Sequence, residues 1–357
     1  MSDTRKEAEQ KMAKAIFISG DCWLAVFDLL PPSQLAFGIA MISHRFDFYV
    51  AEHFKTRKWA LKFLQIQSQI GENGTKEVKI VNYGKPAPIP RTIPRIEFPR
   101  KVSGFERIII SYIDRNAIEF LHRLRQLFVS SPMNLTIETN NDRILESISR
   151  NIWPMIGKNI GGMHLSGRIF HRLRQFVPSI LRDCPSLRVV SLYYVDMFTE
   201  FPADDNAMAS DGQAIAKWLF TPRSDGVPKV FKSKSAENDR NSALMLEAFK
   251  TAFINASSPV NFVVDISFPY ALSVVPFELT NGFTREQLAL KRTDYHRRFL
   301  LVRCPIVRDV DKWAKWEKEA IGWEFPNQWK RIYILIFDED EIGDGLLNAT
   351  PGPSDQQ

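Results

Sequence analysis

The residue types that could do chemistry are few in this 357-residue sequence, and they lie far apart. The histidines and cysteines are His44, His53, His122, His164, His171, His296, Cys22, Cys184 and Cys304. An odd number of distant cysteines favours neither a disulfide framework nor a cysteine zinc site, and it indicates a reducing compartment. The sequence has no G-x-S-x-G elbow, phosphate-binding Gly-rich loop, H-E-x-x-H or C-x-x-C pair. We therefore predict a protein that is not an enzyme, with no catalytic residue, metal site or cofactor.

Composition and charge indicate a folded protein with more than one unit. The chain is 45% hydrophobic, enough for a sizeable core. Its net charge of +6 is spread without a Lys/Arg block, so nucleic-acid binding is unsupported and a solvated basic surface is favoured. Asp21 and Asp28 interrupt the apolar stretch near the start, which predicts neither a signal peptide nor a spanning helix. We expect no membrane partner and a cytoplasmic or nuclear location.

Residues 21–54 carry a dense load of apolar residues at helical spacing. Three stripes predict three short helices, and their members are Trp23, Leu24, Phe27 and Leu30, then Leu35, Ile39, Ile42 and Phe46, then Phe46, Tyr49, Val50 and Phe54. Asp21 is expected to cap the first helix, Pro31 and Pro32 to end it, and Ser33 to cap the second. The pattern predicts a compact helical unit.

These residues resemble the F-box family. Trp23–Leu30 is similar to the aliphatic and aromatic run of that family's first helix, and Pro32–Leu35 to its proline and polar residue before a leucine. Ile42–Phe46 is similar to its hydrophobic, serine, basic and aromatic sequence. At the start, Gly20–Trp23 replaces the family's usual Leu-Pro pair. The resemblance covers residues 18–58, and any helical hairpin with a Pro-Pro turn would present a similar pattern.

The resemblance implies a partner and a division of labour within the helical unit. An F-box docks on the Skp adaptor of a cullin-RING ubiquitin ligase, so part of its apolar surface must stay uncovered in the free protein. The expected adaptor contacts are Trp23, Leu24, Pro32, Leu35 and Ile39. The expected core residues are Phe27, Leu30, Ile42, Phe46 and Val50.

From Val102 onward, strand and helix patterns alternate, which predicts an α/β fold. Strand centres near Ile109, Ile137, Leu165 and Val190 recur every 25 to 28 residues, an interval found in leucine-rich repeats. An L-x-x-L-x-L skeleton fits three of these strands, but the asparagine expected after it is replaced by Ile113, Arg168 and Val195. We therefore expect an irregular strand–helix array resembling degenerate leucine-rich repeats, whose apolar faces are buried by stacking.

The organisation expected for the whole chain follows from these patterns and from five prolines within Gly84–Pro99. Residues 55–70 either close the last helix of the helical unit or bridge it to the next one. Residues 274–304 contain three strands with short links, typical of an antiparallel meander. The expected units are a polar lead (1–14), an F-box-like helical domain (15–70), a Pro-rich linker (71–101), an α/β repeat-like domain (102–267), a C-terminal α+β cap (268–337) and an acidic, disordered tail (338–357).

Two functions are consistent with this organisation. The first is a substrate-recognition adaptor of an SCF-type (Skp–cullin–F-box) ubiquitin ligase, with a protein substrate held by the C-terminal domain. Strand residues expected to line one binding surface are Arg107, Thr136, His164 and Ser191. The alternative is a stand-alone α/β scaffold for protein–protein interaction, in which the helical unit only caps the array. Four tryptophans between Trp313 and Trp329 either cap the sheet or form a recognition surface.

Overall fold

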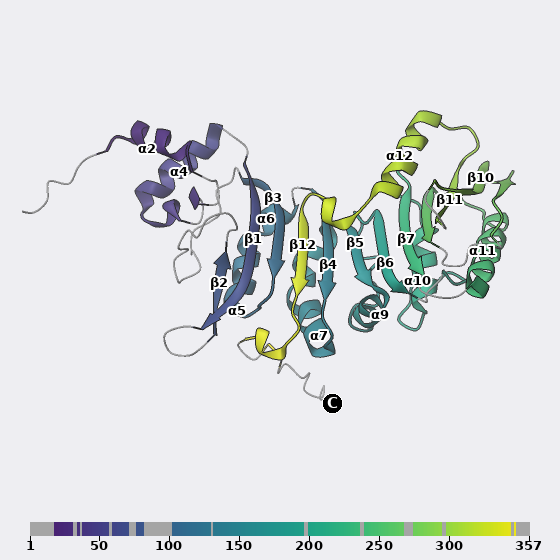
Figure 1. The fold of residues 1–357 in the computed structure, drawn as a ribbon, viewed down its shortest axis with the longest axis horizontal. Helices are drawn as coiled ribbons and strands as arrows, with labels where there is room; N and C mark the ends of the chain where they lie inside the picture. Colours follow the sequence, from purple (N-terminus) through teal and green to yellow (C-terminus); the bar gives the residue numbers. More distant parts are fainter. Residues whose placement is uncertain are drawn as a thin grey trace, which may run out of the picture.

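One twelve-stranded sheet organises the described part of the chain (Figure 1). The structure, a computed structural model, describes residues 18–30, 34–35, 38–56, 59–70, 76–81, 102–129, 131–195, 199–235, 239–267, 274–294, 298–343 and 346–347. The strand order across the sheet is β2-β1-β3-β12-β4-β5-β6-β7-β8-β11-β10-β9. The prediction of a mixed α/β fold is therefore confirmed.

The middle of the sheet is parallel and its two edges are antiparallel. The parallel strands are β1 (Trp59–Ile70), β3 (Val102–Ile110), β12 (Arg331–Leu335), β4 (Met133–Glu138), β5 (Ile160–Ser166), β6 (Val189–Val195), β7 (Lys229–Ser235) and β8 (Phe262–Ser267). The antiparallel strands are β2 (Lys76–Val81) at one edge and β11 (Arg298–Pro305), β10 (Glu286–Arg292) and β9 (Phe277–Asn281) at the other. The meander predicted from the three short-linked strands is thus present.

The segments around the expected linker differ from a simple helical domain followed by a connector. Trp59–Ile70, for which a helix end or a bridge was open, forms strand β1 and pairs with β3. Leu64 and Ile66 on this strand are buried. Most of the expected Pro-rich linker, residues 71–75 and 82–101, lies outside the described residues, and between these two stretches the chain forms β2.

Strand β12 lies between β3 and β4 although it is the last of the described strands in the sequence (Figure 1). Arg331 is paired in register with Arg107 on one side and Asn134 on the other. We expected this strand in a cap at the end of the array, and it instead completes the middle of the parallel sheet. The apolar pattern of β12 correctly predicts a core strand, because Ile332 and Ile334 are buried. Such a pattern does not specify which strands will be its neighbours.

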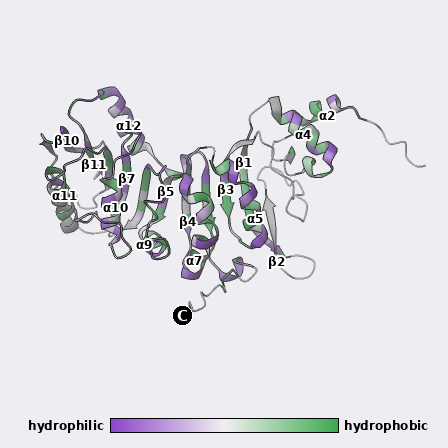
Figure 2. Ribbon diagram, turned by 180° about the vertical axis from the view of Figure 1, so that it is seen from behind, coloured by the Kyte–Doolittle hydropathy of each residue, from purple (hydrophilic) through white to green (hydrophobic). Residues whose placement is uncertain are grey.

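Helices that connect consecutive strands cover one face of the sheet (Figure 2). They are α5 (Arg115–Arg123), α6 (Arg125–Val129), α7 (Asp142–Asn151), α8 (Trp153–Ile156), α9 (Gly167–Phe176), α10 (Asp211–Leu219) and α11 (Asp239–Ile254). Caps at the strand ends start several of them: the Asp114 carboxylate accepts from Ala117 N at 2.6 Å, and the Ser166 hydroxyl accepts from Ile169 N at 3.2 Å. Their inward side chains and the facing strand residues share one apolar core.

A single helix, α12 (Val310–Gly322), packs on the other face, within the part of the chain that the structure describes. Its Trp313 is 5% exposed and packs with Val189, Val230 and Val263 of the sheet. Of the other three tryptophans in this region, Trp316 and Trp323 pack against the same cluster, and Trp329 is 53% exposed. Core packing by α12 therefore accounts for most of the tryptophan content here.

Buried charges fix the C-terminus of α12 on the sheet. Lys232 on β7 donates to Ala320 O, Ile321 O and Trp323 O at 2.8 to 3.1 Å, and its ammonium lies 3.1 Å from the Asp265 carboxylate. Arg298 on β11 pairs with the same carboxylate and donates to Ile321 O at 2.8 Å. Burial lowers the pKa of Lys232, and Asp265 partly offsets this effect.

From this anchor, residues 323–330 cross the sheet to reach β12 (Figure 1). Phe325, at the start of a short 3-10 helix (Phe325–Asn327), stacks on His164 of β5 with ring centroids 5.6 Å apart. Gly162 on β5 leaves room for the start of this segment and for Asn134 of β4, because a Cβ there would clash with the Asn134 side chain and lie 3.1 Å from the Trp323 ring. The crossing segment therefore covers the sheet between α12 and β12.

A buried ion pair in the antiparallel edge gives a first testable prediction. Arg303 and Glu286 are 0% and 1% exposed, their side chains meet at 2.6 Å, and the guanidinium lies between the Phe220 and Phe253 rings. Replacing Arg303 by Ala leaves the Glu286 carboxylate buried without its partner. We expect Arg303→Ala to lower the free energy of unfolding by about 3–5 kcal/mol in urea titrations.

The matched control is Lys315→Ala on the exposed side of α12. We expect the control to change stability by less than about 0.5 kcal/mol. Similar losses for the two variants would contradict a structural role for the buried pair.

Candidate partner-docking site

The N-terminal helical unit lies at one end of the molecule (Figure 1) and contains two α-helices in its described part, α2 (Gly20–Phe27) and α4 (His44–Thr56). A short 3-10 helix (Ile39–Met41) precedes α4. The Ser19 hydroxyl caps α2 by accepting from Cys22 N at 3.4 Å, whereas Asp21, the expected cap, lies in the first turn. Pro31, Pro32 and Ser33, the predicted turn and second cap, lie outside the described residues.

Aromatic packing holds α2 against α4. The Trp23 ring meets Phe46 edge-on with centroids 4.8 Å apart, and the Phe27 ring meets His53 edge-on at 5.9 Å. Phe27 and Val50, both expected in the core, are fully buried. The other expected core residues Leu30 and Phe46 are partly buried against the same cluster. Aromatic rings from both helices therefore form the centre of the unit.

Two residues of the helical unit, Leu35 and Ile42, have the opposite of the burial expected for them. Leu35, expected as an uncovered adaptor contact, is 0% exposed, and Ile42, expected in the core, is 63% exposed. Ile42 follows the 3-10 turn and its N–H donates to Ile39 O, so the tighter turn shifts it away from the α-helical stripe on which the prediction was based. Trp23, Leu24 and Ile39, the other described contact candidates, pack partly buried against the core.

The exposed apolar residues of the unit lie elsewhere, chiefly on the outer face of α2. Cys22, Ala25, Val26 and Leu29 follow one another at helical spacing, and we call these four residues the α2 surface. Val26 is 43% and Leu29 84% exposed. Ile42 and Phe48 add two further exposed apolar side chains at the start of α4. Exposed apolar residues beside a buried stripe are a feature of docking surfaces, so the α2 surface is a candidate site for a partner.

The sequence held the signal for the α2 surface, although the prediction missed it. Val26 is an apolar residue beside the buried stripe of Trp23 and Phe27, and Leu29 is an apolar residue in the turn after α2, two positions where a surface helix and its end normally carry polar residues. Arg45 fixes the orientation of this face, because it donates to Ile18 O at 3.1 Å and to the Tyr49 hydroxyl at 3.2 Å. The beginning of α2 is thereby tied to α4.

Comparisons with protein-family models, curated proteins and solved structures found no match. Within the described residues, no three or more His, Cys, Asp or Glu side chains come together in a way that could hold a metal ion. No helix among those residues has the length and apolar character needed to cross a membrane.

The four residues predicted to bind substrate belong to the sheet face that carries α12, which we call the open face. Thr136 is paired in register with His164, and His164 with Ser191. Thr136 and Ser191 are only 2% and 8% exposed: Thr136 donates to His164 O at 2.7 Å, and the Ser191 hydroxyl lies 3.1 Å from His164 Nδ1. The crossing segment covers this region, so of the four only Arg107 and His164 are partly exposed.

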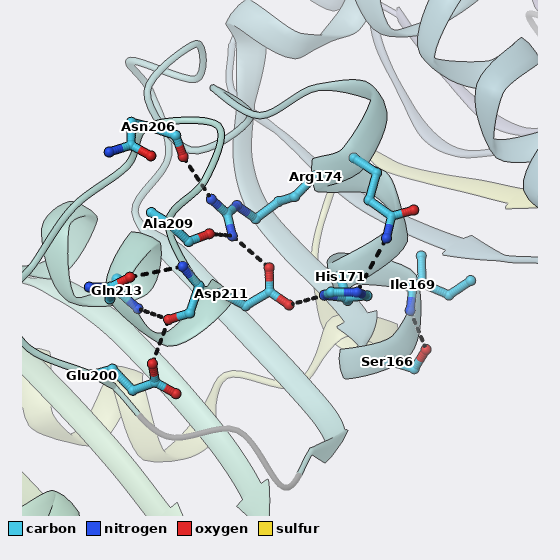
Figure 3. A network of polar contacts seen from close by, with 11 residues as sticks. Ser166, Ile169, His171, Arg174, Glu200, Asn206, Ala209, Asp211 and Gln213 are labelled. Carbon is cyan, nitrogen blue, oxygen red and sulfur yellow. Dashed lines mark hydrogen bonds and ion pairs between the residues drawn. The ribbon is translucent and has the colours of Figure 1, made fainter.

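A polar network on the helical face joins α9 to α10 (Figure 3). The buried Asp211 carboxylate accepts from Arg174 at 2.7 Å through one oxygen and lies 2.7 Å from His171 Nδ1 through the other. Arg174 also donates to Ala209 O at 3.0 Å, which secures the loop before α10. His171, which the sequence analysis did not assign to any site, thus helps to dock two helices.

A second prediction concerns Leu35 and Ile42 of the helical unit. Leu35→Ala removes a fully buried side chain, so we expect a loss of about 2–5 kcal/mol of unfolding free energy. Ile42→Ala removes a side chain that is 63% exposed and should cost less than about 1 kcal/mol. Chemical denaturation of the two variants measures both values. Equal losses would contradict the burial described for this unit.

The cysteines provide a third prediction, on pH. Burial raises the pKa of the Cys184 thiol well above its ordinary range and raises the pKa of Cys304 to about 11, whereas Cys22 is exposed. Because both thiols are harder to ionise in the folded state, their contribution to the free energy of unfolding is fully present below pH 9. It is lost as the pH rises through the folded-state pKa values.

We therefore expect an alkylating reagent at pH 8 to modify Cys22 alone in the native protein and all three cysteines in denaturant. Intact mass and peptide mapping would show this pattern. Native modification of Cys184 or Cys304 at a rate equal to that of Cys22 would contradict it.

Proposed function

We propose that this chain is the substrate-recognition subunit of an SCF-type ubiquitin ligase, with the helical unit acting as an F-box that binds the Skp adaptor. The observation that carries the proposal is the α2 surface together with Ile42. Its residues expose apolar side chains on a unit whose order of motifs resembles an F-box. The adaptor contacts proposed here are Val26, Leu29 and Ile42 in place of the buried Leu35.

The α/β part would hold a protein substrate. Strands β4 to β8 follow one another in chain order, all parallel, with their connecting helices on one face. That arrangement supports a degenerate repeat array, with β12 as an addition within it. The work of such a subunit is positioning: it raises the effective concentration of substrate lysines near the charged conjugating enzyme, and other subunits carry out the transfer. We propose a cytoplasmic or nuclear location for this activity.

A stand-alone scaffold is the second candidate, and one observation favours it. Phe27, Val50 and Phe54 of the helical unit belong to the same buried cluster as Leu64 and Phe105 of the sheet. A helical unit that shares its core with the sheet can serve as a cap at that end of the array. The two candidates differ in what they require of the α2 surface, because only the ligase subunit needs it to bind an adaptor.

The fourth prediction tests the proposal through Leu29. Leu29→Asp places a charge at the most exposed apolar residue of the α2 surface, and burying an unpaired charge in the complex should weaken adaptor binding at least tenfold. The matched control is Leu244→Asp on α11, because Leu244 is also a well-exposed leucine, at 69% against 84% for Leu29. Calorimetric titration of the full chain with a purified Skp adaptor measures the affinities.

Both variants should keep the melting temperature of the unmodified chain, because both side chains are exposed. Adaptor binding should also slow the alkylation of Cys22, which belongs to the α2 surface. No detectable adaptor binding by the unmodified chain, or equal affinities for the two variants, would favour the scaffold.

A further inference from the structure

Among the residues that the structure describes, nothing covers part of the open face in the way that a parallel sheet is normally covered. Parallel strands are usually buried on both faces, and here α12 and the crossing segment cover the portion from β11 to β5 and reach β12 where Phe325 meets the Tyr333 ring edge-on, with centroids 5.0 Å apart. Over β1, β3 and β12, by contrast, Gln65, Ile109 and Tyr333 occupy one register row, and all three are partly exposed. An exposed region containing aromatic and aliphatic side chains is typical of a binding surface.

Two arginines lie side by side in this region. Arg107 of β3 and Arg331 of β12 are paired in register, so their side chains leave the sheet on the same face. Arg331 has a carboxylate partner, since its guanidinium donates to Glu106 at 3.1 Å and also to Pro326 O. Arg107 makes no ion pair with any residue that the structure describes, and it stacks over the Phe63 ring at 4.9 Å.

The charges at this place are not balanced. Like charges on directly opposed strand positions destabilise a sheet, and Glu106 supplies one carboxylate for two guanidinium groups. Asn134, which is paired in register with Arg331, adds no negative charge, and its amide group donates to Trp329 O at 2.9 Å. In addition, Nε of Arg107 and Nε of Arg331 are buried without an acceptor. An anionic group above Arg107 would supply the missing charge.

We propose that the uncovered part of the open face binds an extended protein segment through an anionic side chain held by Arg107, with an apolar neighbour over Ile109 and Tyr333. This proposal deepens the proposed function and rests on it, because the bound segment would belong to the substrate. A guanidinium stacked on an aromatic ring is fixed in one plane and presents a fork that matches a carboxylate or phosphate. Tyrosine and arginine are also the residue types that dominate protein-binding hot spots.

A nucleic acid fits this surface less well than an acidic protein segment does. Glu138 lies on the same face of β4, two positions beyond Thr136, and is exposed. Together with Glu106, it would repel a continuous phosphate backbone. One anionic side chain flanked by neutral residues matches a surface with a single unpaired arginine.

The test uses the full chain and fluorescein-labelled peptides read by fluorescence anisotropy at physiological salt. One peptide carries a single glutamate flanked by tyrosines and neutral residues, a second has phosphoserine in place of the glutamate, and a third has glutamine there. We expect the two anionic peptides to bind at least tenfold more tightly than the glutamine peptide, as charge-assisted hydrogen bonds require. Whichever of the two binds more tightly identifies the anion as carboxylate or phosphate.

Arg107→Gln should then reduce binding of the anionic peptides about tenfold and leave the glutamine peptide unaffected. Lys315→Gln, an exposed change on α12, is the matched control and should leave all affinities unchanged. Arg107→Lys keeps the charge without the planar fork and should retain part of the binding. Circular dichroism and melting temperature verify that each variant is folded.

Three results would overturn the proposal: no binding of either anionic peptide, equal affinities for anionic and neutral peptides, or an unchanged affinity in Arg107→Gln. Tighter binding of oligo-dT than of the peptides would assign the surface to nucleic acid instead. The measurement is independent of the adaptor. Failure here with intact adaptor binding would therefore leave the ligase proposal standing, and loss of adaptor binding with intact peptide binding would remove only that proposal.

Discussion

The arrangement of this molecule depends on the hydrogen bonds and ion pairs by which Lys232, Asp265 and Arg298 hold the C-terminus of α12 on the sheet. A helix ends with carbonyl groups that lack intrahelical partners, and here Lys232 and Arg298 donate to them while the Asp265 carboxylate on the strand between pairs with both cations. The fixed end of α12 determines where the chain sets out across the sheet. It thereby determines how much of the open face is covered and how β12 reaches the gap between β3 and β4.

Lysines buried at the ends of helices recur elsewhere in the fold. Lys229 donates to Thr221 O at 2.6 Å and to Trp218 O at the end of α10, and Lys330 donates to Leu127 O of α6 at 3.1 Å. Burial lowers the pKa of both, to about 8 for Lys229. These ammonium groups are held in poorly solvated positions because they complete helix ends next to the sheet. Some of the basic residues suggested by composition as a solvated surface are therefore structural.

The strands and helices of the α/β part were predictable because each carries a local period. Ile144 and Ile148 of α7 and Val263 of β8 have the burial that their spacing indicates. Partners in space were not predictable, as the place of β12 shows, because a buried strand has the same pattern beside any neighbour. In the helical unit, a 3-10 turn displaced Ile42 from the expected stripe. The sequence pattern of α2 did not predict which of its apolar residues would be exposed. Arg107 was singled out from the sequence, but its lack of a carboxylate partner is a property of the fold.

The position of β12 also determines when the molecule can fold. Arg331 and Glu106, which meet across β12 and β3, are 225 positions apart in the chain. A ribosome releases residue 106 long before residue 331, so the backbone groups by which β3 and β4 pair with β12 stay unpaired until β12 has been synthesised. Closing so long a loop late makes folding slow, and the incomplete sheet offers open strand edges to other chains. A nascent chain of this protein would therefore depend on chaperones until its last strand is in place.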